Sequence, residues 1–377
     1  MWLRLLISEV TKPEYFTSGL HVQVRRREYI GVQALRAIAA LGVVAYHGTT
    51  LWAQRMTSTP AASEWIAGST GVDVFFVISG FVMMLTSQRL QSAGGAREFL
   101  IRRLIRIVPL YWLVTTIKLV GLLWSASLAV NSMPSWSEVL RSYCFIPYRH
   151  PDGNVTVLVI VGWTLVFEMF FYVIFAFGIA TRRNKVQFLT VVMGLIGAIG
   201  LFRRPDWPVA SFVVDPLVLE FLAGVYLAKL VMVRPRVLPR TVAWGVCLSW
   251  IIYLSLFSGW EDGRLRIFVA GIPAMLTVAA VVSLEDQLHR WIPGWLRTLG
   301  DASYSIYLVH GLVLPVLGVL MVRYGFFDRA SAKATAVILS LVFSSFTGVF
   351  VYRICEYPLT EWLKGKARPR SRQEQLV

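Results

Sequence analysis

The chain has 377 residues, of which 56% are hydrophobic and 15% are charged, and its formal net charge at pH 7 is +16. This composition, with a mean hydropathy of +0.62, excludes an ordinary water-soluble domain and indicates an integral membrane protein. Topology and attraction to anionic membrane lipids explain the positive charge, so there is no reason to expect nucleic-acid binding. The three cysteines have no paired or metal-like spacing, which argues against a disulfide framework or a zinc site.

Apolar stretches long enough to cross a bilayer recur along the whole chain. We predict ten spanning helices, at about residues 30–54, 69–88, 107–126, 157–180, 187–202, 209–231, 241–259, 265–284, 303–323 and 334–354. The sequence therefore predicts an all-α fold, a polytopic membrane helix bundle. Residues 1–29 are expected to form a cytoplasmic N-terminal segment, residues 30–358 the membrane domain and residues 359–377 a basic cytoplasmic tail.

The distribution of Lys and Arg over the loops predicts the orientation of this bundle. Segments on the side of the N-terminus hold more than twice as many basic residues as the segments on the other side. Because cytoplasmic loops are enriched in positive charge, we expect both termini to be cytoplasmic. An even number of spans agrees with this arrangement.

The first predicted span carries a cation and an imidazole, Arg36 and His47, in otherwise apolar sequence. On a helix this spacing places the two side chains within roughly 20° of one face and about 16 Å apart along the axis. Ionisable residues inside a membrane are candidates for function. Each also has an ordinary explanation, because Arg36 can reach the cytoplasmic surface and His47 can form an interhelical hydrogen bond.

Asp73 stands near the start of the second predicted span and has two interpretations. Its carboxylate can cap the helix by accepting backbone hydrogen bonds. It can equally orient an imidazole on the neighbouring first helix and fix which nitrogen carries the proton. Farther along the same span, Ser79 and Gly80 are small enough to allow close helix approach.

A cluster of arginines, Arg102, Arg103 and Arg106, precedes the predicted third span on the cytoplasmic side. Contact with lipid headgroups is the ordinary explanation. The functional alternative is a soluble cofactor that bears phosphate groups, because planar guanidinium groups match phosphate oxygens.

Two later spans contain further polar residues. The fourth buries Glu168 between Trp163 and Tyr172, and a carboxylate is tolerated there only with a partner such as arginine or in its protonated form. The ninth supplies a second intramembrane histidine, His310.

These elements, taken in order, resemble the acyltransferase-3 family of integral membrane O-acyltransferases. The matching segments are the Arg36-to-His47 spacing, Gly71–Phe81, Arg102–Tyr111, Trp163–Tyr172, Glu220–Gly224, Gly300–His310 and Glu356–Pro358. They extend over about residues 30–360; each is weak alone, but the ordered set is specific.

The resemblance implies a bacterial cytoplasmic-membrane enzyme that moves an acyl group, most often acetyl from acetyl-CoA, onto a sugar hydroxyl of a lipid-linked or growing glycan. No metal is expected, and the implied partners are the glycan, membrane lipids and polysaccharide assembly machinery. Members with an additional extracytoplasmic domain are much longer. The chain is therefore similar to the stand-alone form that acetylates succinoglycan-type exopolysaccharides.

On this interpretation, a neutral histidine is suited to remove the proton from the attacking hydroxyl, and we expect His47 to be the general base. Asp73 is expected to orient its ring, and Arg36 to hold the pantetheine or phosphate end of the donor. The nucleotide phosphates are assigned to Arg102, Arg103 and Arg106. The residues expected to shape the cavity are Trp163, Glu168, Tyr172 and His310.

Two other classes of protein remain possible from the sequence. A transporter of lipid-linked saccharides would line a passage with the same charged and aromatic residues, but it would not depend on CoA. A structural subunit of a polysaccharide export complex would tolerate replacement of His47.

Overall fold

The computed structural model describes residues 28–56, 65–124, 133–150, 153–181, 184–257, 265–325 and 332–367. Most of the predicted N-terminal segment and the last ten residues of the predicted tail lie outside this part of the chain. Within it, helices dominate, and the sheet consists of two short antiparallel strands, β1 (Tyr148–Arg149) and β2 (Val155–Thr156). The all-α prediction is confirmed.

The main helices follow the predicted spans. They are α2 (Ile30–Met56), α4 (Gly71–Thr86), α5 (Ala93–Trp124), α7 (Trp163–Ala180), α8 (Lys185–Gly200), α9 (Val218–Val233), α10 (Arg240–Leu256), α11 (Ile272–Ser283), α14 (Ser303–Arg323) and α15 (Ala332–Val351). The shorter helices are η2 (Ile66–Thr70), α6 (Trp136–Tyr143), η4 (Ile160–Gly162), η5 (Val209–Val213), η7 (Ile267–Gly271), α12 (Glu285–Trp291), α13 (Gly294–Asp301), η9 (Tyr352–Glu356) and α16 (Tyr357–Ala367).

Among the described residues, seven helices are long and apolar enough to cross a membrane. An eighth is added if residues 267–283 and 285–291, which are bent by 76° relative to each other, count as one span. The shorter apolar helices α8 and α10 occupy the positions of the predicted fifth and seventh spans. Every predicted span therefore has an apolar helix, although α8 and α10 are shorter than a full crossing requires and the eighth reaches that length only together with the bent segment that follows it.

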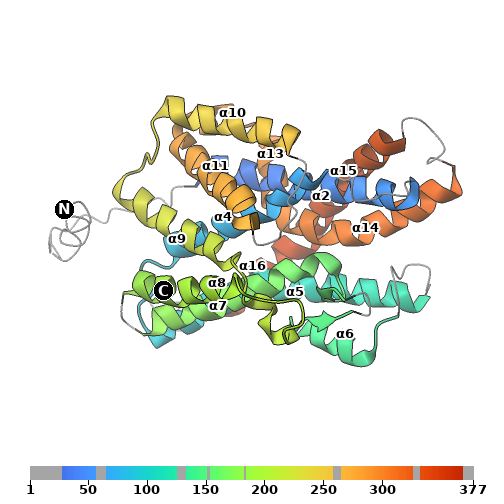
Figure 1. The fold of residues 1–377 in the computed structure, drawn as a ribbon, viewed down its shortest axis with the longest axis horizontal. Coiled ribbons are helices and arrows are strands. Elements are labelled where there is room, and N and C mark those ends of the chain that lie inside the picture. Colours follow the sequence, from blue (N-terminus) through green and yellow to red (C-terminus); the bar gives the residue numbers. More distant parts are fainter. Residues whose placement is uncertain are drawn as a thin grey trace, which may run out of the picture.

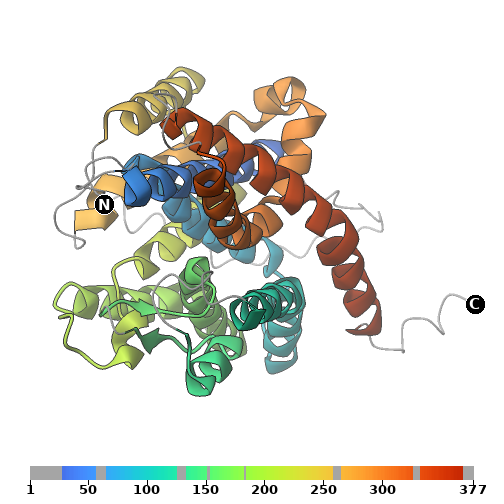
Figure 2. The ribbon, with the colours of Figure 1, turned by 90° about the vertical axis from the view of Figure 1, so that its right-hand side faces the viewer.

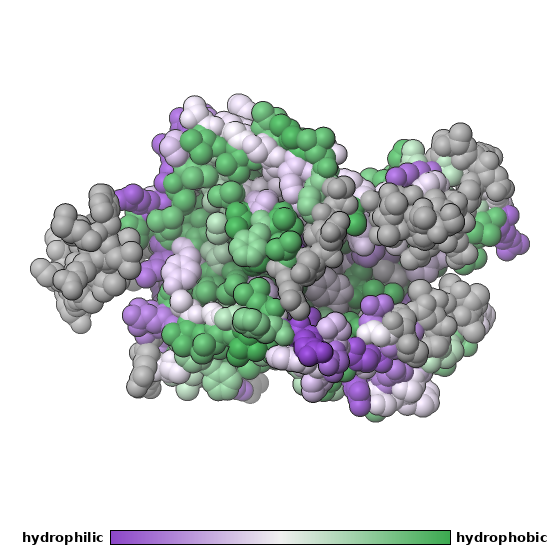
Figure 3. All heavy atoms as spheres, in the orientation of Figure 1, coloured by the Kyte–Doolittle hydropathy of each residue, from purple (hydrophilic) through white to green (hydrophobic). Residues whose placement is uncertain are grey.

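The outer surface of the bundle is strongly apolar. Phe177 of α7 is 61% exposed and Phe346 of α15 is 73% exposed. Figure 3 shows hydrophobic side chains covering much of one face of the molecule. An apolar surface of this extent is unfavourable in water but matches the hydrocarbon region of a bilayer.

Helices α2 and α4 lie in the middle of the bundle (Figures 1 and 2). On one side of them are α5, α7 and α8, and on the other side are α10, α11, α14 and α15. The start of α2 is fixed by Glu285, whose carboxylate accepts hydrogen bonds from the backbone N–H groups of Ile30 (2.7 Å) and Gly31 (3.0 Å). A carboxylate is favourable at this point because the first N–H groups of a helix lack partners within the helix.

Helices α4 and α9 are in backbone contact. A Cβ atom at Gly80 of α4 would lie 2.0 Å from the carbonyl oxygen of Phe221, and one at Gly224 of α9 would lie 2.0 Å from that of Val77. The prediction that Gly80 allows close helix approach is confirmed. This contact holds α4, which carries Asp73 and Ser79, in a fixed position.

We expect Gly80→Ala and Gly224→Ala to destabilise the bundle, because each added methyl group would meet backbone atoms that cannot move aside independently. Overpacking of this kind costs about 1–3 kcal/mol. The measurement is the thermal midpoint of the monodisperse protein in detergent. Gly245→Ala in α10 is the matched control, because no atom lies within 4 Å of its Cβ position. Equal midpoints for all three variants would show that the α4–α9 contact is not tight.

Candidate active site

A cavity of about 110 Å³ lies inside the bundle, between α2, α4, α5, α7 and α14. We refer to it as the inner cavity. Its walls are largely apolar, with side chains such as Phe75, Phe76 and Leu165. The polar residues that line it are Arg36, Ser79, Arg103, Arg106, Thr164, Glu168, Tyr172, Tyr304 and Tyr307.

A second cavity of about 350 Å³, the outer cavity, shares Arg36, Arg103 and Arg106 with the inner one. These three guanidinium groups therefore stand where the two cavities adjoin, and we call them the arginine collar. The remaining polar lining comes from helix ends on the predicted cytoplasmic side. It consists of Gln33, Thr86, Arg102, Asp301, Tyr352, Glu356, Tyr357, Thr360, Glu361 and Lys364.

The collar is positioned by two helices. Arg36 of α2 donates a hydrogen bond from Nη1 to Gln33 Oε1 (2.9 Å). Arg103 of α5 donates from Nη2 to Thr86 Oγ1 (2.7 Å), and its guanidinium lies 5.6 Å from the centre of the Phe99 ring. Arg106 follows Arg103 by three residues, a spacing that places both on one helix face.

Arg102 is separated from the collar. It lines the outer cavity, but its guanidinium pairs with Glu98 on the same helix and its side chain is 54% exposed. The arginine cluster of the sequence thus divides into two residues at the collar and one at the rim.

Asp301 contributes negative charge to the outer cavity at the end of α13. Burial raises the pKa of its carboxyl group above the ordinary value, while the nearby Arg36 guanidinium acts in the opposite direction. Glu356, another acidic residue of this cavity, accepts a hydrogen bond from Ser305 Oγ (2.6 Å). The outer cavity is therefore basic at the collar and mixed in charge at its rim.

Glu168 lies on the wall of the inner cavity and is held by two hydroxyl groups. Its Oε1 accepts hydrogen bonds from Tyr172 Oη (2.5 Å) and from Ser79 Oγ (3.2 Å). The collar residues Arg103 and Arg106 line the same cavity. This partly buried carboxylate thus has both donors and neighbouring positive charge, as its position in the sequence requires.

Trp163, at the start of α7, does not line either of these two cavities. Its ring packs against Phe167 and Phe212, and the guanidinium of Arg266 lies 5.8 Å from its centre. Trp163 therefore belongs to a different cluster from Glu168 and Tyr172, with which the sequence grouped it.

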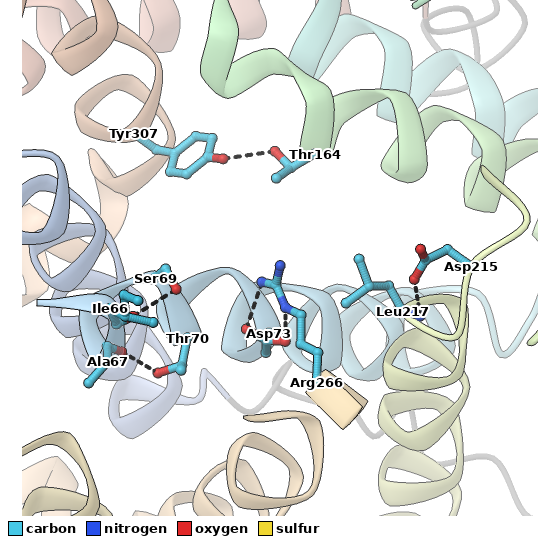
Figure 4. Close-up of polar contacts among 10 residues, drawn as sticks. All are labelled: Ile66, Ala67, Ser69, Thr70, Asp73, Thr164, Asp215, Leu217, Arg266 and Tyr307. Atoms are coloured by element: carbon cyan, nitrogen blue, oxygen red, sulfur yellow. Dashed lines mark hydrogen bonds and ion pairs between the residues drawn. The ribbon is translucent and has the colours of Figure 1, made fainter. Parts of the chain in front are cut away.

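The two intramembrane histidines lie together. The ring centres of His47 on α2 and His310 on α14 are 5.2 Å apart, and the ring planes are inclined by 33°. Neither lines the two cavities, but Tyr307, whose ring centre is 5.7 Å from that of His310, lines the inner one. The Tyr307 hydroxyl is 3.0 Å from Thr164 Oγ1 (Figure 4). It also donates a hydrogen bond to the Val161 carbonyl oxygen (3.0 Å). Polar groups therefore extend from the inner cavity to His47 through Thr164, Tyr307 and His310.

Asp73 has a different partner from the one expected. Its two oxygens accept hydrogen bonds from Nε and Nη2 of Arg266, each at 3.0 Å, and the carboxylate is fully buried (Figure 4). The suggested roles as helix cap and as orienting group of His47 are therefore corrected, because among the described residues no hydrogen bond joins Asp73 to His47 or to a backbone N–H, and its partner is Arg266. The partners are 193 positions apart, so no local pattern connects them.

A second buried carboxylate, Glu220 of α9, lies beside this pair. Its oxygens accept no hydrogen bond within the described residues, although its carboxyl group lies next to that of Asp73. A Cβ atom at Gly271 would lie 2.7 Å from its Oε1. Because Gly271 follows Arg266 in the same helical segment, the ion pair and Glu220 form one buried cluster that joins α4, α9 and η7.

Comparison with known proteins identifies relatives over most of the chain. The model of an acyltransferase domain, that of the acyltransferase-3 family, matches residues 29–354. The exopolysaccharide production protein ExoZ of Rhizobium meliloti (strain 1021) is 36% identical over 317 residues, which are 80% of this chain and 92% of that protein. No solved structure matches the chain.

More distant relatives are longer proteins. The putative O-acetyltransferase SACOL0978 of Staphylococcus aureus (strain COL) is 25% identical over 347 residues, which are 79% of this chain and 52% of that protein. The peptidoglycan O-acetyltransferase OatA of Listeria monocytogenes serovar 1/2a is 23% identical over 334 residues, 77% of this chain and 51% of that protein. The region that matches the present chain is thus about half of each.

We expect Asp73→Ala to destabilise the fold by about 3–5 kcal/mol, because it removes the fully buried carboxylate that pairs with the Arg266 guanidinium, whose side chain is only 17% exposed. The thermal midpoint in detergent and the yield of monodisperse protein measure this effect. The matched control is Asp286→Ala, which breaks an ion pair with Arg236 whose side chains are 50% and 54% exposed. Such an exposed pair contributes about 0–1 kcal/mol. A small effect at Asp73, similar to that at Asp286, would contradict the assignment.

Proposed function

Because this chain belongs to the acyltransferase-3 family and is therefore an acyltransferase, we propose that it transfers an acetyl group from acetyl-CoA to a sugar hydroxyl of an exopolysaccharide precursor in the bacterial cytoplasmic membrane. The observation that carries the proposal is the pair of adjoining cavities that meet at the arginine collar. The printed names of the relatives, which refer to exopolysaccharide and to peptidoglycan, support a glycan as the acceptor.

The outer cavity suits the nucleotide end of the donor. Its volume of about 350 Å³ is within the usual range for small-molecule sites. Guanidinium groups from Arg36, Arg103 and Arg106 offer charge-assisted hydrogen bonds to phosphate oxygens. Arg102 adds positive charge at the rim. The phosphates are therefore placed at the collar and in the outer cavity, where water can still reach them.

The inner cavity suits the acyl end. An apolar cavity of about 150 Å³ holds a molecule of the size of benzene, so the volume of about 110 Å³ here is sufficient for an acetyl group. The long pantetheine arm connects the two cavities through the collar. The rise of α2 from Arg36 to His47, about 16 Å, is a distance that an extended arm can reach.

The chemical step is the attack of a sugar hydroxyl on the thioester carbon, with His47 as general base. His47 takes the hydroxyl proton while the new C–O bond forms, and the C–S bond then breaks to release the CoA thiolate. The imidazolium returns its proton to the thiolate, which leaves as the thiol. Hydrogen-bond donors around the reacting carbonyl stabilise the negative oxygen that develops during the attack.

Replacement of His47 by alanine is expected to lower acetyl transfer by about 10²- to 10⁴-fold, because the general base is lost. The assay follows label from radiolabelled acetyl-CoA into the polysaccharide fraction of membranes with matched protein levels. His289→Ala, at an exposed position of α12, is the control and should retain full transfer. Undiminished transfer by His47→Ala would remove this residue from the mechanism. Absence of transfer with the unmodified protein would overturn the donor assignment and favour a transporter.

Arg103→Ala and Arg106→Ala are each expected to raise the KM for acetyl-CoA by about 10- to 100-fold, since a hydrogen bond to a charged group contributes about 1.5–3 kcal/mol. Arg102→Ala should have a smaller effect, because its guanidinium is already paired with Glu98. Arg141→Ala, on the exposed surface of α6, is the control for loss of positive charge alone.

Acetyl-pantetheine, which lacks the nucleotide, provides the decisive comparison for these variants. If the collar binds the nucleotide phosphates, the KM for this shorter donor should be the same in Arg103→Ala, Arg106→Ala and the unmodified protein. An equal loss with both donors would show that the arginines maintain the shape of the cavities and do not bind phosphate.

A further inference from the structure

His310 is a buried titratable group that the chemistry described above does not use. Its side chain is 1% exposed, and neither ring nitrogen makes a hydrogen bond of ordinary geometry within the described residues, although the backbone of Ile306 and Tyr307, one turn back on the same helix, lies close to the ring. Buried polar groups are almost always hydrogen-bonded, so an unpartnered imidazole requires an explanation. The polar ring that it contacts on the neighbouring helix is the proposed general base, His47.

A histidine that acts as a general base needs a partner for its second nitrogen. That partner selects the tautomer and holds the ring in the orientation in which the reactive nitrogen faces the substrate. Asp73 is the carboxylate that the sequence suggests for this role, but both of its oxygens are engaged by Arg266. The structure thus separates Asp73 from the role and places a second imidazole next to His47.

We propose that His310 is a positioning residue for His47: its unprotonated nitrogen accepts a hydrogen bond from the N–H of His47 that faces away from the sugar hydroxyl. This inference rests on the proposed function. A neutral imidazole has one acceptor nitrogen and one donor, so it can fill this role without a charge. The ring centres are close enough for a modest rotation of either ring to form the bond, and hydrogen bonds of catalytic groups often form fully only when substrate binds.

The proton balance of the reaction is unchanged by this role. The hydroxyl proton moves to the reactive nitrogen of His47 and from there to the leaving thiolate, while the His47 N–H that faces His310 stays in place. His310 remains neutral, because two adjacent imidazolium ions in an apolar interior would repel each other strongly. Tyr307, which lies next to His310 and reaches the inner cavity wall, fixes the second side of the His310 ring by packing.

The test compares three substitutions of His310. His310→Ala removes the acceptor, His310→Phe replaces the ring by an apolar one of similar shape, and His310→Asn keeps a side-chain acceptor. We expect Ala and Phe to lower kcat for acetyl transfer by about 10- to 1,000-fold with little change in the KM for acetyl-CoA, because orienting groups affect the chemical step. Asn should retain more activity than Phe.

Added imidazole gives a readout that a structural role would not change. The space left by His310→Ala should admit imidazole and recover part of kcat, whereas His310→Phe, which fills the space, should not respond. Ser303→Ala is the matched control, because Ser303 is a buried polar residue of the same helix whose hydroxyl also lacks a partner among the described residues. It should behave as the unmodified protein with and without imidazole.

The unmodified protein and His47→Ala are assayed in parallel, so that the two proposals can fail separately. If the unmodified protein is active, His47→Ala is inactive and all three His310 variants keep their kcat, the positioning role is overturned and the proposed function stands. The positioning role is also overturned if the loss of activity in the His310 variants is fully explained by a lower amount of folded protein. A rise in KM without a fall in kcat overturns it as well. If the unmodified protein transfers no acetyl group, both proposals are rejected.

Discussion

The charge of the arginine collar is the constraint on which the interior of this protein depends. A guanidinium group in the hydrocarbon region is costly unless it faces a polar partner or a space that water or a ligand can enter. Arg36, Arg103 and Arg106 meet this requirement by lining two adjoining cavities. The surrounding helices must therefore stay apart at this point, although the same helices pack closely elsewhere. A fully packed bundle of the same apolar helices would leave three buried positive charges without solvation.

Helix α4 shows how the bundle combines a rigid ion pair with an open cavity. Asp73 and Ser79 are separated by six residues, which places them about 120° apart around the helix axis. Asp73 thus pairs with Arg266 on one side, while Ser79 donates to Glu168 at the inner cavity on another. The backbone contact of Gly80 with α9 fixes the rotation of α4 and so determines both directions at once. The structural cluster and the cavity wall are consequently set by the same helix orientation.

The sequence predicts those features that depend on local periodicity and composition. Long apolar runs locate the helices of the bundle. Contacts between residues that are far apart in the sequence cannot be predicted in this way. The pairing of Asp73 with Arg266 and the approach of His310 to His47 depend on how whole helices dock, and the residue types alone allow several partners. Trp163 illustrates the same limit, because its neighbour Glu168 along the helix faces the inner cavity while Trp163 packs against Phe212 and Arg266.

The position of the histidine pair relative to the cavities has a consequence for how the acceptor must approach. His47 and His310 do not line either cavity, so under the proposed function the donor would enter from the side of the collar and stop in the inner cavity. Under the same proposal, the sugar hydroxyl would reach His47 from a direction other than the collar. With two separate entrances, the donor and the acceptor need not pass through the same opening to reach the reaction centre. The arginine collar fits this separation, because its three guanidinium groups would hold the charged nucleotide of the proposed donor while the neutral thioester passes inward.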